Sequence, residues 1–281
     1  MRSAALILVL LAAVLLARPA AADNCDDAGL CRIASGEYRL ALPEGAAGPV
    51  PAMLYLHGWG GSAAGVMKKR GLVEALAARG YALIAPDGVP RPGHHASNRD
   101  WGVSDGGTHP RDDLAFLAAV IADAARHGVD GDRVLMAGFS RGASMVWEVA
   151  CRAPATARAY APVAGAFWEP LPGRCMGGVD LFQTHGWGDR VVPLEGRAVG
   201  DGAFVQGDVF ASLRLLRAAL GCNPQMPDEA RDHVEGEFWL RRWSGCPGGE
   251  LVLMVHPGGH AVPKGWLGRV LDWFEARTAG G

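Results

Sequence analysis

The 281-residue sequence has no excess of charge of either sign. Lysine and arginine number 27 against 29 aspartates and glutamates, a formal charge of −2, and no Lys/Arg-rich block occurs. Binding to a phosphate backbone needs clustered cations, so nucleic acid is not an expected partner. The 40 glycines and 18 prolines follow no three-residue period, which excludes collagen, and the 49% of hydrophobic residues excludes a disordered chain.

The sequence also lacks the spacing of a metal-binding motif. No Cys-x-x-Cys pair and no Cys/His cluster at zinc spacing occurs, and the adjacent His94 and His95 have no third ligand near them. We therefore expect no metal ion, and nothing in the sequence indicates another cofactor.

The apolar run near the N-terminus is too short for a permanent membrane span. It covers residues 4–17, against the ~20 residues that cross a bilayer, follows Arg2, and precedes small residues at Ala20 and Ala22. This pattern predicts a signal peptide over residues 1–22, with an uncleaved anchor as the alternative. We expect a secreted or periplasmic protein with no stable membrane span after cleavage.

All six cysteines follow this segment. An even number of cysteines in an oxidising compartment favours disulfides, and six cysteines allow 15 pairings. Pairing neighbours in the sequence closes the shortest loops. The favoured set is Cys25 with Cys31, Cys151 with Cys175, and Cys222 with Cys246.

From about residue 36 onward, short apolar runs alternate with longer amphipathic stretches, which is typical of an α/β fold with a mostly parallel sheet. The runs are nearly continuously apolar, so helices are expected to cover both faces of the sheet. The expected strands are residues 52–57, 81–86, 133–138, 159–164, 179–185 and 251–256, with residues 37–42 as an antiparallel edge. The expected helices are residues 66–79, 111–127, 140–152, 202–220 and 263–277. Without repeats or linkers, residues 23–281 are expected to form one domain.

The pentapeptide Gly138-Phe139-Ser140-Arg141-Gly142 is a Gly-x-Ser-x-Gly motif between an expected strand and an expected helix. A serine in this position lies on a strained turn that exposes its hydroxyl, and larger flanking residues would collide with the backbone. The pentapeptide alone also fits a simple glycine-flanked turn. Ser140 is thus a candidate nucleophile that requires a histidine base and a carboxylate.

His260 and Asp189 are the candidates for that base and that acid. Each follows the end of an expected parallel strand, where the active edge of such a sheet lies. His256 is the nearest rival base but is expected to be structural, and Asp189 also fits an ordinary turn. The order Ser140, Asp189, His260 is the order of the α/β-hydrolase fold, which is the expected fold class.

Two backbone amides are candidates for stabilising an oxyanion. One is the amide of Arg141, directly after the serine, and the other is the amide of Trp59 in the Gly-rich loop after the first parallel strand. Gly58 is the alternative to Trp59. His57 in the same loop is expected to hold the turn by hydrogen bonding.

Several motifs together resemble the secreted esterase family of polyhydroxybutyrate depolymerases and feruloyl or acetylxylan esterases. They are His57-Gly58-Trp59-Gly60-Gly61, Trp101, Asp112-Asp113, Gly138-Phe139-Ser140-Arg141-Gly142, Ala161-Pro162-Val163-Ala164-Gly165, His185-Gly186-Trp187-Gly188-Asp189 with Val192-Pro193, and Gly258-Gly259-His260. The resemblance covers nearly all of the chain after the signal peptide. It implies an α/β-hydrolase that hydrolyses esters with Ser140, Asp189 and His260 as its triad.

Two departures from that family limit the expectation about substrate. The chain has Arg141-Gly142-Ala143 where the family often has Asn-Gly-Gly after the serine, and Ala261-Val262-Pro263 where Trp-Pro commonly follows the histidine. The expected partner is a small or polymeric ester, either a polyhydroxybutyrate-type polyester or oligomer or a feruloyl or acetyl ester of plant polysaccharide. Trp101 and Trp187 are the expected substrate contacts.

Two other functions fit the same residues. One is a serine peptidase on the same fold, and the other is a non-catalytic, secreted carbohydrate-binding protein. The sequence indicates no oligomeric state.

Overall fold

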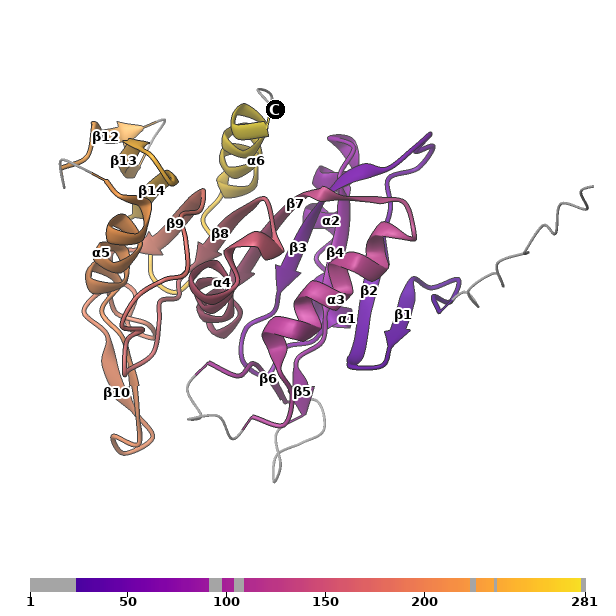
Figure 1. Ribbon diagram of the computed structural model, residues 1–281, viewed down its shortest axis with the longest axis horizontal. Helices are drawn as coiled ribbons and strands as arrows, with labels where there is room; N and C mark the ends of the chain where they lie inside the picture. Colours follow the sequence, from indigo (N-terminus) through magenta and orange to yellow (C-terminus); the bar gives the residue numbers. More distant parts are fainter. Residues whose placement is uncertain (1–23, 91–97, 104–108, 223–225, 235–236, 279–281) are drawn as a thin grey trace, which may run out of the picture.

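A computed structural model describes residues 24–90, 98–103, 109–222, 226–234 and 237–278 of the chain. The expected signal peptide and the His94-His95 pair lie outside these ranges. The described residues are organised around one ten-stranded sheet, in the order β1-β2-β4-β3-β7-β8-β9-β14-β13-β12 (Figure 1).

The six central strands of this sheet run parallel. They are β4 (Ala82–Pro86), β3 (Val50–Leu56), β7 (Val129–Phe139), β8 (Ala159–Val163), β9 (Leu181–Gly186) and β14 (Gly249–His256). Each corresponds to an expected strand, with bounds shifted by a few residues. The fold class predicted from the sequence, a mostly parallel α/β sheet, is therefore confirmed.

Antiparallel strands extend the sheet at both sides. They are β1 (Leu30–Ile33), β2 (Gly36–Ala41), β12 (Glu229–Val234) and β13 (Phe238–Cys246). The expected edge strand, residues 37–42, is antiparallel as predicted but lies second from the edge, because β1 pairs with its outer side. Strands β1, β12 and β13 were not predicted from the sequence, because they are short or rich in charged residues.

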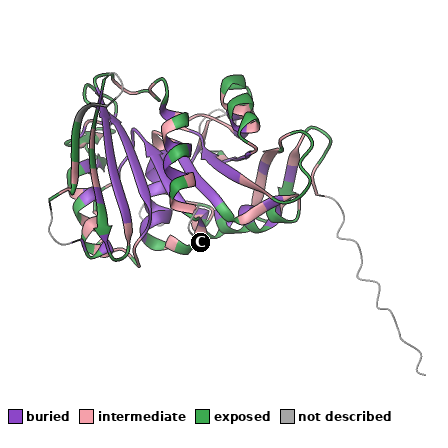
Figure 2. Cartoon of the chain, turned by 90° about the horizontal axis from the view of Figure 1, so that it is seen from above, coloured by how far each residue is buried: buried purple, intermediate pink, exposed green. Residues whose placement is uncertain are grey.

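Helices cover both faces, and their apolar side chains form one core on each face. One face carries α3 (Asp113–Ala125), α4 (Arg141–Arg152) and α5 (Val209–Leu220); the other carries α1 (Ala63–Met67), α2 (Arg70–Ala78) and α6 (Trp266–Thr278). A short 3-10 helix, Pro154–Thr156, follows α4. Figure 2 shows the buried residues concentrated along the central strands beneath these helices.

The expected helix over residues 202–220 was wrong in its first part. Residues 197–206 form a two-stranded ribbon, β10 (Arg197–Val199) and β11 (Phe204–Gln206), and α5 begins only at Val209. The ribbon turns at Gly200 and Gly202, both with positive φ, a conformation that glycine adopts without strain. Asp208 caps α5, since its side chain accepts a hydrogen bond from the Ala211 amide at 2.7 Å.

The expected helix over residues 66–79 is also divided. The structure has two helices, α1 and α2, that are separated at Lys68 and Lys69. A second small ribbon, β5 (Val89–Pro90) with β6 (Arg99–Asp100), lies on the same side of the sheet as β10 and β11, below it in Figure 1.

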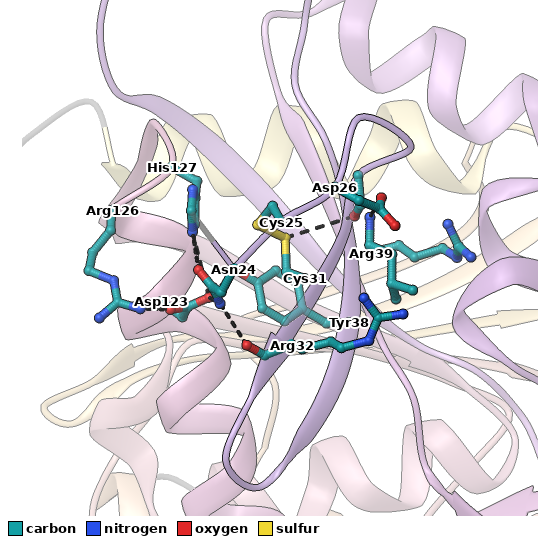
Figure 3. The surroundings of a disulfide bond; sticks show 12 residues. Asn24, Cys25, Asp26, Cys31, Arg32, Tyr38, Arg39, Asp123, Arg126 and His127 are labelled. Atoms are coloured by element: carbon teal, nitrogen blue, oxygen red, sulfur yellow. Dashed lines mark hydrogen bonds and ion pairs between the residues drawn. A yellow bond between two sulfur atoms is a disulfide. The ribbon is translucent and has the colours of Figure 1, made fainter. Parts of the chain in front are cut away.

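The six cysteines form three disulfides, Cys25–Cys31, Cys151–Cys175 and Cys222–Cys246, which are the pairs favoured by loop length. Figure 3 shows the first of these beside a polar cluster that ties the beginning of the described chain to α3. Asn24 donates to Asp123 at 2.8 Å, and the Tyr38 hydroxyl donates to the same carboxylate at 2.7 Å. Burial raises the pKa of Tyr38 to about 12.

Within the described ranges, no helix is long and apolar enough to cross a membrane. The same residues include no group of three or more His, Cys, Asp or Glu side chains that is placed to hold a metal ion.

Candidate active site

Ser140 lies on the sharp turn between β7 and α4. Its φ is 58° and its ψ is −121°, a combination that is strained for a residue with a side chain and is often found at functional sites. The turn is fixed on both sides, because the Ser140 amide donates to the Val163 carbonyl at 2.9 Å and its carbonyl accepts from the Ser144 amide at 3.0 Å. The strained backbone of Ser140 is therefore held in place by hydrogen bonds on both sides.

The two glycines of the motif allow β7 and α4 to approach neighbouring backbone. A Cβ atom on Gly138 would lie 2.7 Å from the carbonyl carbon of Gly142. A Cβ atom on Gly142 would lie 2.4 Å from the carbonyl oxygen of Leu56, at the end of β3. Neither distance is possible for a real side chain, so the elbow and the loop after β3 pack together only with glycine at these positions.

The structure brings the three predicted residues together in a hydrogen-bonded chain. His260 Nε2 lies 2.9 Å from Ser140 Oγ, and His260 Nδ1 lies 2.8 Å from Asp189 Oδ2. These contacts join residues that are 120 and 71 positions apart in the sequence. With Nδ1 donating to the carboxylate, the free lone pair of Nε2 faces the serine hydroxyl, as a general base requires.

Asp189 is buried, and its second oxygen is held as firmly as its first. Oδ1 accepts hydrogen bonds from the amides of Val191 and Val192 at 2.8 and 2.9 Å. Burial opposes ionisation of this carboxyl, but the hydrogen bonds from His260 and the two amides outweigh it and hold the pKa of Asp189 below its usual value. Asp189 is therefore a fixed anion directed at His260.

His256, the alternative candidate for the base, is not part of this hydrogen-bonded chain. His256 is buried, and its Nδ1 accepts a hydrogen bond from the Gly258 amide at 3.2 Å. Burial lowers the pKa of His256, so it is neutral at neutral pH. The residue shapes the loop that carries His260, in agreement with its expected structural role.

The loop after β3 lies against the elbow. A Cβ atom on Gly58 would be 3.4 Å from the Cβ atom of Ser140. His57 holds this loop, since its Nδ1 donates to the Gly58 carbonyl at 2.8 Å and its Nε2 accepts from the Gly88 amide at 3.0 Å. Burial lowers the pKa of His57, which keeps it neutral.

Two amides near Ser140 are candidates for binding an oxyanion. The Arg141 amide is the first of α4, and the first amides of a helix have no acceptor within the helix. The Trp59 amide has no acceptor among the described residues. Both therefore stay candidates for the oxyanion hole.

A cavity of about 750 Å³ opens beside Ser140. The ribbon β5–β6 contributes one part of its wall and the ribbon β10–β11 another, and most of the lining is apolar. Its lining includes Trp59, Val89, Pro90, Trp168, Val191, Val199 and Phe204. Arg141 joins the elbow to this wall, because its Nε donates to Asp100 of β6 at 2.7 Å and its guanidinium lies over the Trp168 ring.

The two tryptophans expected to contact substrate do not line this cavity. Trp101 is fully buried, and its indole Nε1 donates to the His57 carbonyl at 2.9 Å, so it supports the loop after β3 from below. Trp187 is 68% exposed but lines a second cavity. The cavity wall contains Trp59 and Trp168 instead, and Trp168 Nε1 donates to Ser144 Oγ at 3.2 Å.

A buried chain of polar side chains, which was not predicted from the sequence, lies beneath the site. Trp147 Nε1 donates to Gln183 Oε1 at 3.0 Å, and Gln183 Nε2 donates to His185 Nδ1 at 2.9 Å. His185 Nε2 then donates to the Val192 carbonyl at 2.8 Å and lies 3.6 Å from Asp189 Oδ2. The signal that could have revealed this chain is the polar Gln183-Thr184-His185 within an otherwise apolar strand.

Comparison with known proteins gives consistent matches. The family described as esterase PHB depolymerase matches residues 36–172. NocK of Nocardia uniformis subsp. tsuyamanensis, a protein named as an esterase, is 36% identical over 243 residues, which cover 80% of this chain and 68% of NocK. Feruloyl esterase C of Emericella nidulans is 28% identical over 247 residues, covering 83% of this chain and 78% of that protein.

Solved structures support the same architecture. An acetyl xylan esterase from Aspergillus awamori superposes with a TM-score of 0.64 at 15% identity, covering 85% of this chain and 93% of that chain. A Bacillus cereus carboxylesterase superposes with a TM-score of 0.55 at 14% identity, with the same coverage of the two chains. At these identities the likeness shows the fold, which is the predicted α/β-hydrolase fold.

Proposed function

The chain belongs to the PHB depolymerase esterase family and is a carboxylic ester hydrolase; from this premise we propose that Ser140, His260 and Asp189 are its catalytic triad. The observation that carries the proposal is the unbroken chain of hydrogen bonds from Ser140 Oγ through the His260 ring to Asp189. Membership of an esterase family decides against the non-catalytic carbohydrate-binding alternative.

In the proposed first step, Ser140 Oγ attacks the ester carbonyl carbon while His260 Nε2 takes the hydroxyl proton. Asp189 stabilises the imidazolium that forms. The carbonyl oxygen becomes an oxyanion, which accepts hydrogen bonds from the Arg141 and Trp59 amides. When the oxyanion collapses, the C–O bond to the leaving alcohol breaks and His260 returns its proton to that alcohol.

The second step releases the acid. A water molecule gives a proton to His260 Nε2 and attacks the acyl-enzyme, and the bond to Ser140 Oγ breaks as His260 returns the proton to it. The balance needs only ester and water, so the proposed chemistry uses no cofactor. Residues 23–281 are proposed to form the single catalytic domain that carries it out.

Replacing the nucleophile tests this assignment. We expect Ser140→Ala to lower kcat for 4-nitrophenyl acetate by about 10⁶ without a change in circular dichroism or in the urea midpoint, because the hydroxyl forms the covalent bond. An Arg70→Gln variant, altered on the exposed side of α2, serves as a control with normal turnover. Turnover by Ser140→Ala comparable to that of the wild type would show that another group is the nucleophile.

For the acyl group, the aromatic lining of the cavity favours a feruloyl-type aromatic acid attached to a plant polysaccharide. Trp168 and Phe204 line the cavity and supply aromatic contacts, and the volume suits a single aromatic acyl group. Comparing kcat/KM on methyl ferulate, acetylated xylan and hydroxybutyrate oligomers tests this choice. A preference for hydroxybutyrate oligomers would instead assign the chain to polyesters, and amide cleavage that competes with ester turnover would assign it to peptidases.

The compartment is proposed from the sequence of residues 1–22 and the three disulfides, which persist in oxidising surroundings. Fractionation of cells that express the full chain tests secretion or periplasmic export. Mass spectrometry of the exported protein should find Asp23 at its N-terminus.

A further inference from the structure

A second cavity, of about 700 Å³, lies on the α5 side of the sheet at its β12–β13–β14 end. Three aromatic side chains line it with large exposed fractions: Trp187 at 68%, Phe210 at 42% and Trp239 at 37%. Large aromatic side chains rarely gather at a surface without a binding role. The proposed mechanism uses none of the three.

The charges of this cavity are of one sign. Arg231 and Arg241 line it, and no aspartate or glutamate does. Arg231 is paired with Glu229 at 2.6 Å, whereas Arg241 forms no ion pair with any residue that the structure describes. The cavity therefore combines stacking faces with one uncompensated guanidinium, which binds a carboxylate through parallel hydrogen bonds.

The strand register explains why these groups meet. Trp239 pairs with Val255, and Arg241 pairs with Leu253. Because Trp239 and Arg241 are two residues apart in β13, their side chains lie on the same face of the strand. Trp239 lies at the end of the sheet where β14 leads into the His260 loop. The cavity thus opens at the same edge as the proposed active site.

The two cavities lie on either side of one turn. Trp187 lines the second cavity, and Val191, four residues later, lines the cavity beside Ser140. Four fully extended residues span at most about 14 Å, so the Cα atoms of Trp187 and Val191 lie within the length of a short oligosaccharide. The turn is anchored to the His260 loop, because the Trp187 amide donates to the His256 carbonyl at 2.7 Å.

We propose that this second cavity binds the sugar chain of the substrate, and that the chain it selects carries carboxylates, as a uronic-acid-bearing polysaccharide does. Sugar rings present a face of C–H groups that packs on the negative face of an indole, while their hydroxyl groups remain in water. A carboxylate on a neighbouring sugar pairs with Arg241. A polyester is neutral along its length and offers Arg241 carbonyl oxygens but no carboxylate, which favours the acidic sugar chain.

The inference rests on the proposed function for its connection to catalysis, but binding can be measured without catalysis. The probes are xylo-oligosaccharides with a glucuronic acid branch and the same oligosaccharides without it. Calorimetric titration of Ser140→Ala protein keeps any ester intact. We expect the acidic oligosaccharide to bind more tightly than the neutral one, with a difference that shrinks as salt is added.

Substitutions in the cavity distinguish the contribution of the arginine from that of the aromatic side chains. We expect Arg241→Gln to raise the Kd of the acidic oligosaccharide about fivefold and to leave the neutral one unchanged, the upper range for an exposed ion pair. We expect Trp239→Ala to raise both Kd values about tenfold. Arg70→Gln removes an exposed arginine on α2 and is the matched control, with no change for either probe. Because Arg241 is exposed, its variant keeps the test valid even where Trp239→Ala does not fold.

Several outcomes would overturn the inference. Equal binding of both probes, or equal loss in the Arg241→Gln and Arg70→Gln variants, would remove the carboxylate selection. A concentration-dependent dimer that Trp239→Ala abolishes would make the face an interface between two copies. Failure of the triad would show separately, as 4-nitrophenyl acetate turnover that survives Ser140→Ala while oligosaccharide binding persists.

Discussion

Asp189 is held by more groups than any other member of the proposed triad. One oxygen accepts from His260 and the other from two consecutive backbone amides. An amide side chain at this position would keep the size but could present its NH₂ group to His260. The imidazole would then hold the wrong tautomer, with its Nε2 proton facing Ser140.

We therefore expect Asp189→Asn to lower kcat for 4-nitrophenyl acetate by about 10⁴, with a smaller effect on KM. Steady-state kinetics at pH 7 measure it. Asp201, in the exposed turn between β10 and β11, provides the control, since Asp201→Asn alters no group of the proposed triad. Equal activity of the two variants would contradict the role of Asp189.

The same carboxylate makes stability depend on pH. Its pKa is lower in the folded chain than the usual value of about 4, so folding favours the ionised form. The resulting stabilisation is present above that usual value and is lost as the pH falls through the lower folded value. Urea unfolding should show that the free energy of unfolding falls more between pH 7 and pH 3 for the wild type than for Asp189→Asn. Identical losses would indicate that the pKa of Asp189 is the same in both states.

At the residue scale, motifs alone predicted which serine, histidine and carboxylate meet. The glycines that flank Ser140 and the order of the three residues along the chain can both be read directly from the sequence. Trp101 was misplaced because a tryptophan in a loop gives no sign of whether the loop lies over it or beside it. Gln183 and His185 were missed because their partners come from a different helix and a different loop.

At the scale of elements, Gly142 in α4 packs closely against the end of β3, where its added Cβ atom would lie 2.4 Å from the Leu56 carbonyl oxygen. We expect Gly142→Ala to destabilise the protein by about 1 to 3 kcal/mol and to lower kcat, because the added methyl pushes the Trp59 loop away from Ser140. Thermal unfolding and esterase kinetics measure the two effects. Gly71→Ala in α2 is the control, because a Cβ atom added there would meet no atom within 4 Å. We expect it to be neutral or slightly stabilising. A normal kcat for Gly142→Ala would contradict the coupling.

Among the strands, those buried on both faces were all predicted from the sequence. Continuous apolar runs identify the six parallel strands, since only residues beneath two helix layers can be apolar throughout. Strand β11 was included in the helix expected over residues 202–220 because its three residues alternate too briefly to show a period of two. Strand β13 was missed because Arg241 and Arg242 interrupt its apolar residues, and pairing with β14 rather than composition makes it a strand.

At the scale of the whole molecule, the disulfides act on the unfolded chain. Cys222–Cys246 ties the end of α5 to the end of β13 across 24 residues. A loop of that length corresponds to about 3 to 4 kcal/mol of stabilisation in the chain-entropy account, against about 2 kcal/mol for the six-residue separation of Cys25 and Cys31.

Urea unfolding of the paired serine variants tests this. We expect Cys222→Ser with Cys246→Ser to lose more unfolding free energy than Cys25→Ser with Cys31→Ser. A larger loss for the shorter loop would show that the bridge near the beginning of the described chain acts through native contacts, such as those around Asn24, rather than through loop length.

The three residues of the proposed triad follow three different strands, β7, β9 and β14, and the last of them is residue 260. A chain that emerges from a ribosome or a membrane pore with its N-terminus first therefore stays inert until that histidine has passed. In the proposed mechanism, no partly synthesised or partly exported chain hydrolyses anything. The late position of one imidazole thus makes the onset of activity coincide with completion of the sheet.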